Sequence, residues 1–214
     1  MFPAFNESNF KESCEKVASM DQDLALIISE HGYPPVWNRP NTFESLVHII
    51  LEQQVSLASA LATLNKLREK ITVVSPENVL ALSDEELRAC YFSRQKTTYV
   101  RHLAQALAKD ELNLTELEAL PDEEVRQKLL TLKGIGHWTI DVYLIFVLKR
   151  TDIFPIGDLA AVNALKRIKK LAKNTTRETL LELSTLWQPY RTIATMLLWH
   201  YYLSSAKPKQ VNTP

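Results

Sequence analysis

Hydrophobic residues recur every three or four positions along most of the chain, which is the spacing of one face of an α-helix. The stretch 43–51 shows this pattern directly after Thr42, a residue type that caps helix N-termini, and Ser56 opens a second stretch of the same kind. Ser83 and Pro121 each precede three acidic residues, which the dipole of a helix favours in its first turn. Further helices are predicted at 94–109, 121–132, 137–149, 158–172, 176–187 and 190–203.

Patterns typical of β-strands are almost absent. No stretch alternates between hydrophobic and polar residues over several positions, and the β-branched run at 71–74 is too short to change this. Only four glycines occur in 214 residues, which suits helices joined by short loops better than a turn-rich β-structure. We predict an all-α fold, either as one domain or as two small lobes that share a cleft. The polar tail at 204–214 is expected to be flexible.

The composition excludes several classes of protein. With 46% hydrophobic and 23% charged residues, the chain matches a globular protein and not a disordered one. Its two cysteines, Cys14 and Cys90, are too few for a disulfide framework or a four-cysteine metal site. The longest apolar run, 142–148, is far shorter than the roughly 20 residues that cross a bilayer. No secretory signal is recognisable at the start, so we expect a protein of the reducing cell interior.

The net charge is zero, but the charges are unevenly distributed. Residues 1–60 contain three basic and eight acidic residues, whereas residues 133–173 contain eight basic and three acidic ones. A locally basic stretch attracts a polyanion such as nucleic acid more effectively than the average charge indicates. For the run of cations at 166–173, a solvated helix face is an equally good interpretation.

Three of the four glycines, Gly134, Gly136 and Gly157, lie in one segment. Predicted helices flank the first two, so the turn between them is tight and backbone N–H groups of the second helix can meet a phosphate. Asp158 begins the next predicted helix, where the helix dipole favours a negative charge. Taken alone, the glycine pair fits a plain helical turn and Asp158 fits a simple N-cap.

This segment, together with three others, resembles the helix-hairpin-helix glycosylase superfamily, and within it the alkylpurine glycosylases called DNA-3-methyladenine glycosylase II. The signature of the superfamily is a hairpin, a loop rich in glycine and proline, and an aspartate. The resemblance extends from about residue 40 to residue 203. The matching blocks are LEQQVS at 51–56, FSRQK at 92–96 with Tyr99, GIGHWT at 134–139 continued by FPIGDL at 154–159, and WQPYR at 187–191 with Trp199.

The resemblance implies an enzyme that flips a damaged purine out of duplex DNA and hydrolyses its N-glycosidic bond, with Asp158 as the catalytic residue. Trp138 and Trp199 match positions that line the base pocket, although core packing is an even alternative for Trp199. Tyr143 faces either the pocket or the core. For Trp187 we favour the core.

The resemblance also implies a set of DNA-binding residues. Gln54 matches the wedge, the side chain that fills the gap left by the flipped nucleotide, unless it and Gln53 are merely an exposed helix end. His137 is placed in the set, although a solvent-exposed helix start is the favoured interpretation, and Asp141 is left unassigned. The remaining members are Ser56, Lys133, Gly134, Ile135, Gly136 and Thr139.

One departure from the superfamily concerns the type of reaction. Bifunctional members, which also cut the DNA backbone, have a lysine where this chain has Trp138, so a monofunctional hydrolase is implied. The expected architecture is a single domain of two helical lobes flanking a cleft, with the helix-hairpin-helix at about 121–149 and the loop to the aspartate at 150–158. No cofactor is implied, and a monovalent cation bound by backbone carbonyls of the hairpin is left open.

The expected partner is double-stranded DNA that contains alkylated purines such as 3-methyladenine or 7-methylguanine. We expect a monomer, in the cytoplasm with the nucleoid of a bacterium or in the nucleus of a eukaryote. Three alternatives stay open: a glycosylase of the same fold for another lesion, a helix-hairpin-helix module that binds DNA without chemistry, and a helical scaffold without a nucleic-acid partner.

Overall fold

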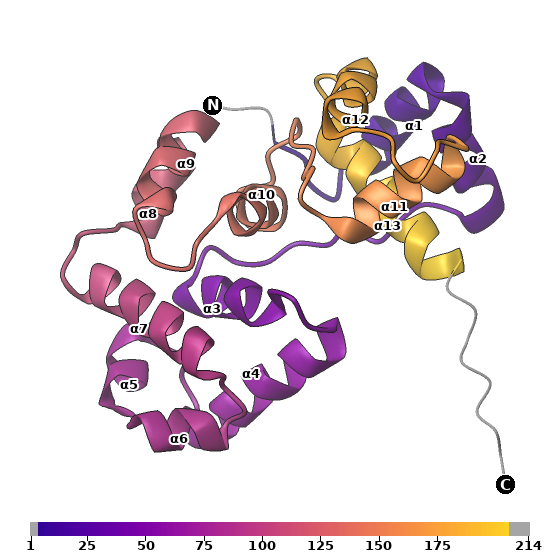
Figure 1. Cartoon of the computed structure of the whole chain (residues 1–214). Coiled ribbons are helices and arrows are strands. Elements are labelled where there is room, and N and C mark those ends of the chain that lie inside the picture. The colour runs from indigo at the N-terminus through magenta and orange to yellow at the C-terminus, as the bar shows by residue number, and fades with distance from the viewer. Residues whose placement is uncertain (1–3, 206–214) are drawn as a thin grey trace, which may run out of the picture. The chain divides into compact units, whose positions relative to one another are not determined.

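In the computed structural model, which describes residues 4–205, every regular element is a helix (Figure 1). The nearest approach to a strand in this range is an isolated antiparallel bridge between Ala4 and Arg150. The chain forms two compact units, the middle unit Asn38–Leu148 and the terminal unit, which combines the segments before and after it. The all-α prediction is confirmed. No helix in the described range is both long and apolar enough to span a membrane.

The middle unit is arranged around α3, in which eight of ten residues are buried. This helix packs against α4, α7 and α10, and α10 is itself buried at seven of its ten positions. Burial on nearly all sides explains why these two segments are so rich in Ile, Leu and Val. The helices of the unit are α3 Phe43–Glu52, α4 Leu57–Ile71, α5 Pro76–Ala81, α6 Asp84–Ala89, α7 Arg94–Ala108, α8 Leu114–Ala119, α9 Asp122–Leu130 and α10 His137–Phe146.

Side-chain caps determine where several of these helices begin. The hydroxyls of Thr42, Ser56 and Ser83 each accept a hydrogen bond from the backbone N–H three residues on. Ser83 and Glu86 complete a reciprocal capping box, and Ser93 caps α7 in the same way as Ser56 caps α4. These hydroxyls replace the acceptors that the first turn of a helix lacks. The helix starts predicted at Thr42, Ser56 and Ser83 are therefore confirmed.

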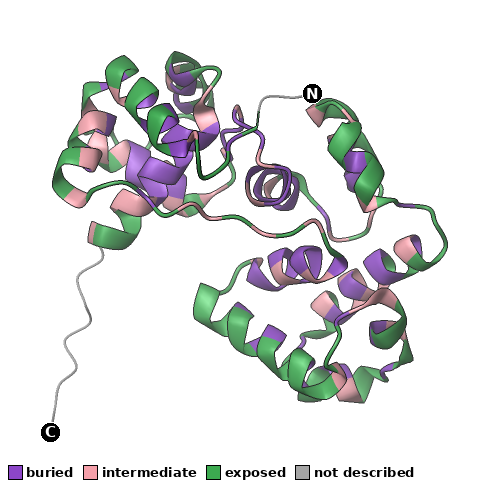
Figure 2. Ribbon diagram, turned by 180° about the vertical axis from the view of Figure 1, so that it is seen from behind, coloured by how far each residue is buried: buried purple, intermediate pink, exposed green. Residues whose placement is uncertain are grey.

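The terminal unit is arranged around α13, whose residues 192–199 are all buried. Its neighbours in the unit are α11, α2, α1 and η1. In both units the buried residues lie on the inward faces of the helices and the exposed residues on the outward faces (Figure 2). The helices of the terminal unit are α1 Phe10–Met20, α2 Gln22–His31, α11 Leu159–Ile168, α12 Arg177–Ser184, the 3-10 helix η1 Thr185–Trp187, and α13 Arg191–Ser205.

The structure contains four helices that the sequence pattern did not predict, α1, α2, α5 and α8. Helices α5 and α8 have six residues each, too few for a hydrophobic repeat to be recognised. In α1 the buried hydrophobic positions Phe10, Cys14 and Val17 do have helical spacing, but strongly apolar residues are few there.

Two predicted helices end three or four residues earlier than expected. Helix α10 stops at Phe146 and α11 stops at Ile168. Lys149 and Lys170, shortly after these ends, have φ angles of 55° and 53°, a left-handed conformation that cannot continue a helix. At the other end of the chain, α13 continues to Ser205, and the rest of the predicted flexible tail, residues 206–214, lies outside the described residues.

Candidate functional site

A short turn at residues 131–136, the hairpin turn, joins α9 to α10 in the middle unit. Gly136 is the N-cap of α10 and, having no side chain, provides no side-chain cap for that helix. Lys133 and His137 are exposed on either side of it. The hairpin turn thus combines backbone donors at a helix N-terminus with a cation, an arrangement suited to binding a phosphate.

The close packing of Tyr99 against the hairpin turn explains why a glycine occupies position 134. Gly134 has a φ of +87°, a conformation that glycine adopts at little cost. The ring of Tyr99 lies so close to the Cα of Gly134 that a Cβ there would overlap the ring. The phenol of Tyr99 also accepts a hydrogen bond from Gln95, within α7. The hairpin turn is therefore supported by an aromatic ring from α7.

Two residues predicted to bind DNA turn their side chains inward. Ile135 is 4% exposed and Thr139 is 2% exposed. The Thr139 hydroxyl accepts a hydrogen bond from the amide of Gln53 at 2.9 Å. Both side chains belong to the packing of the middle unit, so a contact between either residue and DNA would have to use its backbone.

The two glutamines at the end of α3 differ in their surroundings. Gln53 is half-buried, and its amide also donates to the carbonyl oxygen of Gly134 at 2.9 Å. Gln54 is exposed and has a φ of 58°, so the chain turns sharply at this position. Ser56 is exposed and its hydroxyl caps α4. The residues Gln54–Ser56 therefore form an exposed corner, the α3–α4 corner, and Gln54 stays a candidate for the wedge.

Asp158 is the N-cap of α11 in the terminal unit and is half-buried. Its Oδ1 accepts a hydrogen bond from the N–H of Ala161 at 2.8 Å and another from Nε1 of Trp199 at 2.9 Å. The first bond is what an ordinary N-cap makes. The second fixes the carboxylate from a different helix, 41 residues away in sequence. Asp158 is thus both the N-cap of α11 and a carboxylate whose orientation is fixed by the indole of Trp199.

The start of α13 anchors the loop that leads to Asp158. The Thr192 hydroxyl accepts from the N–H of Ile153 at 3.0 Å and donates to the carbonyl oxygen of Arg150 at 2.6 Å. Nε and Nη2 of Arg191 donate to the two carboxylate oxygens of Asp152 at 2.7 and 3.0 Å. Because Trp199 lies further along the same helix, α13 holds both the loop and the carboxylate that follows it.

Trp199 is 9% exposed and has an aromatic neighbour that the sequence pattern did not indicate. The ring of Trp37 lies 6.5 Å from that of Trp199, edge to face at 71°. Trp37 belongs to a non-helical segment between α2 and α3, where no periodic pattern could mark it, and an aromatic residue in a proline-rich loop was the single indication. Trp187, by contrast, is fully buried and donates to Asp21 at 2.8 Å, which agrees with its prediction as a core residue.

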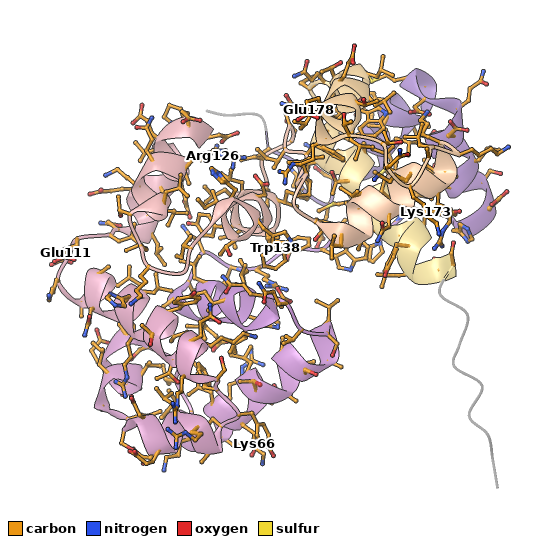
Figure 3. All side chains as sticks on the ribbon, in the orientation of Figure 1. Lys66, Glu111, Arg126, Trp138, Lys173 and Glu178 are labelled. Atoms are coloured by element: carbon orange, nitrogen blue, oxygen red, sulfur yellow. The ribbon has the colours of Figure 1, made fainter. Side chains whose placement is uncertain are left out.

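Helix α10 resolves two residues that the sequence left open. Tyr143 is fully buried in the middle unit, and its hydroxyl donates to Oδ1 of Asn41 at 2.8 Å. The sequence left open whether Tyr143 faces the base pocket or the core. In the structure it lies in the core, so it is no longer a candidate for the base pocket. Asp141 accepts from Nη2 of Arg126 on α9 at 2.6 Å, a partly buried ion pair that connects the two helices of the hairpin. Trp138 is half-buried at the start of α10 (Figure 3), and its predicted role in a base pocket stays a prediction.

The cations at 166–173 divide into two groups. Lys166 donates to the carbonyl oxygen of Lys173, and Lys169 pairs with Asp21 and Asp23. These contacts are structural. Exposed side chains remain at Arg167, Lys170 and Lys173, the last of which is labelled in Figure 3. Among the described residues, no group of three or more His, Cys, Asp or Glu side chains is placed to hold a metal ion.

Comparison with known proteins shows the family to which the chain is similar. Residues 47–189, which include the hairpin turn and Asp158, match the model of the HhH-GPD superfamily of base excision DNA repair proteins. A relative from Bacillus subtilis is 30% identical over 184 residues, which cover 82% of this chain but 64% of the relative's own length.

Two solved structures are also similar to this chain. The DNA-3-methyladenine glycosidase of Bacillus halodurans has 30% identity and a TM-score of 0.76, and the match covers 89% of this chain and 88% of that one. The Schizosaccharomyces pombe 3-methyladenine DNA glycosylase Mag1, solved in complex with abasic DNA, has 28% identity and a TM-score of 0.80, with 88% and 95% covered. By its family match, its helix-hairpin-helix and its overall fold, the chain belongs to the HhH-GPD superfamily of base excision DNA repair proteins.

Proposed function

We propose that this protein is a monofunctional DNA glycosylase that hydrolyses the N-glycosidic bond of alkylated purines in duplex DNA. The observation that supports this most directly is the carboxylate of Asp158, which two donors, Ala161 N–H and Trp199 Nε1, hold in one orientation. A charge fixed in advance stabilises an opposite charge in a transition state without having to reorganise. The two similar solved structures are both named for 3-methyladenine.

A carboxylate held in this way is the main catalytic group that the proposed hydrolysis requires. An alkylated purine is already cationic, so when the bond between the base and C1′ breaks, the base takes the bonding electrons and leaves as a neutral molecule. The positive charge passes to the sugar, near its ring oxygen, where Asp158 would stabilise it. A water molecule then adds to C1′ and gives up one proton, which completes the hydrolysis. Because Trp138 stands where bifunctional members have lysine, no amine is available there to form a Schiff base.

The middle unit would hold the DNA. The uncapped N-terminus of α10 and the exposed Lys133 suit a backbone phosphate, and Gln54 on the α3–α4 corner would fill the space that the flipped nucleotide leaves. Such a partner would place the protein at the nucleoid of a bacterium or in the nucleus of a eukaryote.

A panel of damaged bases tests the proposed function. Duplexes that contain 3-methyladenine, 7-methylguanine, hypoxanthine or 8-oxoguanine are incubated with the protein, and release of free base is measured. We expect the two methylated bases to be released fastest, and we expect borohydride to trap no covalent enzyme–DNA adduct. Fastest release of 8-oxoguanine, or a trapped adduct, would instead identify a glycosylase of the same superfamily with another substrate or mechanism.

Trp138 is expected to contribute to the preference for cationic bases. The face of an indole attracts a cation by about 0.5–2 kcal/mol, and a neutral base gains none of this. Trp138→Leu should therefore lower the ratio of 7-methylguanine release to hypoxanthine release by about tenfold. An unchanged ratio would show that Trp138 does not help the protein to distinguish cationic from neutral bases.

Trp199 is expected to assist through its hydrogen bond to Asp158. Trp199→Phe keeps an aromatic ring but removes the Nε1–H donor, and a hydrogen bond to a charged group contributes about 1.5–3 kcal/mol. We expect the single-turnover rate of 7-methylguanine release to fall by about one to two orders of magnitude. Trp187→Phe is the matched control, since Trp187 donates to Asp21 in the same unit. It should lower the unfolding temperature and leave the excision rate of the folded protein near the parental value, and a rate loss equal to that of Trp199→Phe would contradict the assignment.

A further inference from the structure

Gln53 connects the end of α3 to the hairpin turn. Its Nε2 donates to the carbonyl oxygen of Gly134 and to the hydroxyl of Thr139, each at 2.9 Å. Because a carbonyl oxygen can only accept, the nitrogen of the amide is the atom that must face it. Both N–H bonds of the Gln53 amide are thereby used, and its partners lie before and after the start of α10. Gln53 is thus bound to the hairpin turn at two points.

Helix α7 also contacts both the end of α3 and the hairpin turn. Nζ of Lys96 donates to the carbonyl oxygen of Leu51 at 2.5 Å, close to the end of α3. Burial lowers the pKa of Lys96, as expected for an ammonium group turned into the protein. Tyr99, about one turn further along α7, lies against Gly134. The end of α3 and the hairpin turn are therefore held together directly by Gln53 and indirectly through α7.

The residue after Gln53 begins an exposed surface. Gln54 has a left-handed φ of 58°, and the side chains that follow it, Val55 and Leu57, are 45% and 62% exposed. Gln53, which is hydrogen-bonded to the hairpin turn, directly precedes the exposed α3–α4 corner. The Cα atoms of Gln53 and Gln54 are therefore only about 3.8 Å apart. The position of Gln54 therefore depends directly on how Gln53 is held.

We propose that Gln53 is a positioning residue: its amide sets the spacing between the hairpin turn and the α3–α4 corner, so that both contact one DNA duplex without further ordering. Two surfaces that are already fixed relative to each other bind with less loss of conformational freedom. This proposal rests on the proposed function, because it takes the hairpin turn as the phosphate site. Gln53 itself would not contact DNA, in contrast to the role that the sequence implied for it.

The test uses variants of the full chain that alter the amide. Gln53→Leu removes both donors at similar size, and Gln53→Glu places a carboxylate against the Gly134 carbonyl. Thr139→Val removes one acceptor, and Thr139→Ser retains it. The control variants are Gln105→Leu and Gln105→Glu, which make the same changes at an exposed position of α7 with no side-chain partner in the described structure. For each variant, dissociation constants for a duplex with a tetrahydrofuran abasic site are measured over a salt series, with the unfolding temperature.

We expect Gln53→Leu to raise the dissociation constant about tenfold and to reduce the slope of log K against log salt by about one, the contribution of one phosphate contact at Lys133. Gln53→Glu should have the larger effect. The single-turnover rate at saturating enzyme should change less than the affinity, and Thr139→Ser should bind like the parent while Thr139→Val does not. A neutral side chain that only stabilised the fold would leave the salt slope unchanged.

Two failures can be distinguished in this experiment. If the parent binds the abasic duplex and Gln53→Leu binds it with the same affinity and salt slope, the positioning role is wrong even when the unfolding temperature falls. If the parent itself shows no affinity for the abasic duplex that decreases with salt, the hairpin turn is not a phosphate site, and the proposed function fails with it.

Discussion

Replacing Asp158 with asparagine is expected to slow the release of 7-methylguanine by about two to three orders of magnitude while the fold is kept. Asparagine is as good an N-cap as aspartate, and its side-chain oxygen can still accept from Ala161 N–H and Trp199 Nε1. The variant therefore loses the negative charge and little else. Single-turnover release of base from methylated duplex DNA, at saturating enzyme, measures the effect.

The matched control is Glu182→Gln, which removes a carboxylate from an exposed position on α12 of the same unit. This variant should release 7-methylguanine at the parental rate, and Asp158→Asn should bind an abasic duplex with nearly parental affinity. Parental release by Asp158→Asn would mean that Asp158 serves α11 as a cap alone, and the chemistry proposed here would be wrong.

The parts of the fold that could be predicted from the sequence are those determined by local interactions. Thr42, Ser56 and Ser83 mark helix starts because the atoms that they cap are three residues away. Helix ends were harder to predict. The ends of α10 and α11 precede lysines in a left-handed conformation, and lysine has no particular tendency to end a helix in this way, so nothing in the sequence marked these positions.

The residues of the candidate site could be predicted from the sequence, but the contacts between them could not. The segment around Gly134 and Asp158 could be recognised as a motif, but the partners of its residues are far away in the chain. Trp199 binds Asp158 across 41 positions, and Gln53 reaches Gly134 across 81. Such pairs depend on how helices pack, which the periodicity of a single helix does not record. For this reason Gln53 was expected to contact DNA, and Trp37 was not expected at all.

Gly134→Ala is expected to have the largest effect on the middle unit. A residue with a Cβ at a φ of +87° costs about 1 kcal/mol, and the Cβ would overlap the ring of Tyr99, which adds about 1–3 kcal/mol of overpacking. We expect the free energy of unfolding to fall by about 2–4 kcal/mol. Because the strain is at the hairpin turn, affinity for an abasic duplex should fall as well, and equilibrium denaturation together with binding measurements would show both effects.

The other glycines separate the two causes of this effect. Gly32→Ala introduces a Cβ at a φ of +76° with no atom within 4 Å, and Gly136→Ala introduces one in open space without a positive φ. Gly32 also has a ψ of −170°, a region of backbone space that essentially only glycine adopts, so Gly32→Ala should cost about 1–3 kcal/mol, and Gly136→Ala should cost almost nothing in stability. Adding Tyr99→Ala to Gly134→Ala removes the overlapping ring, so the alanine should then add only about 1 kcal/mol to the cost of Tyr99→Ala alone. If Gly134→Ala costs as much in the Tyr99→Ala background as it does in the parent, the ring of Tyr99 yields to a methyl group, and the close packing of α7 against the hairpin turn is not what fixes its conformation.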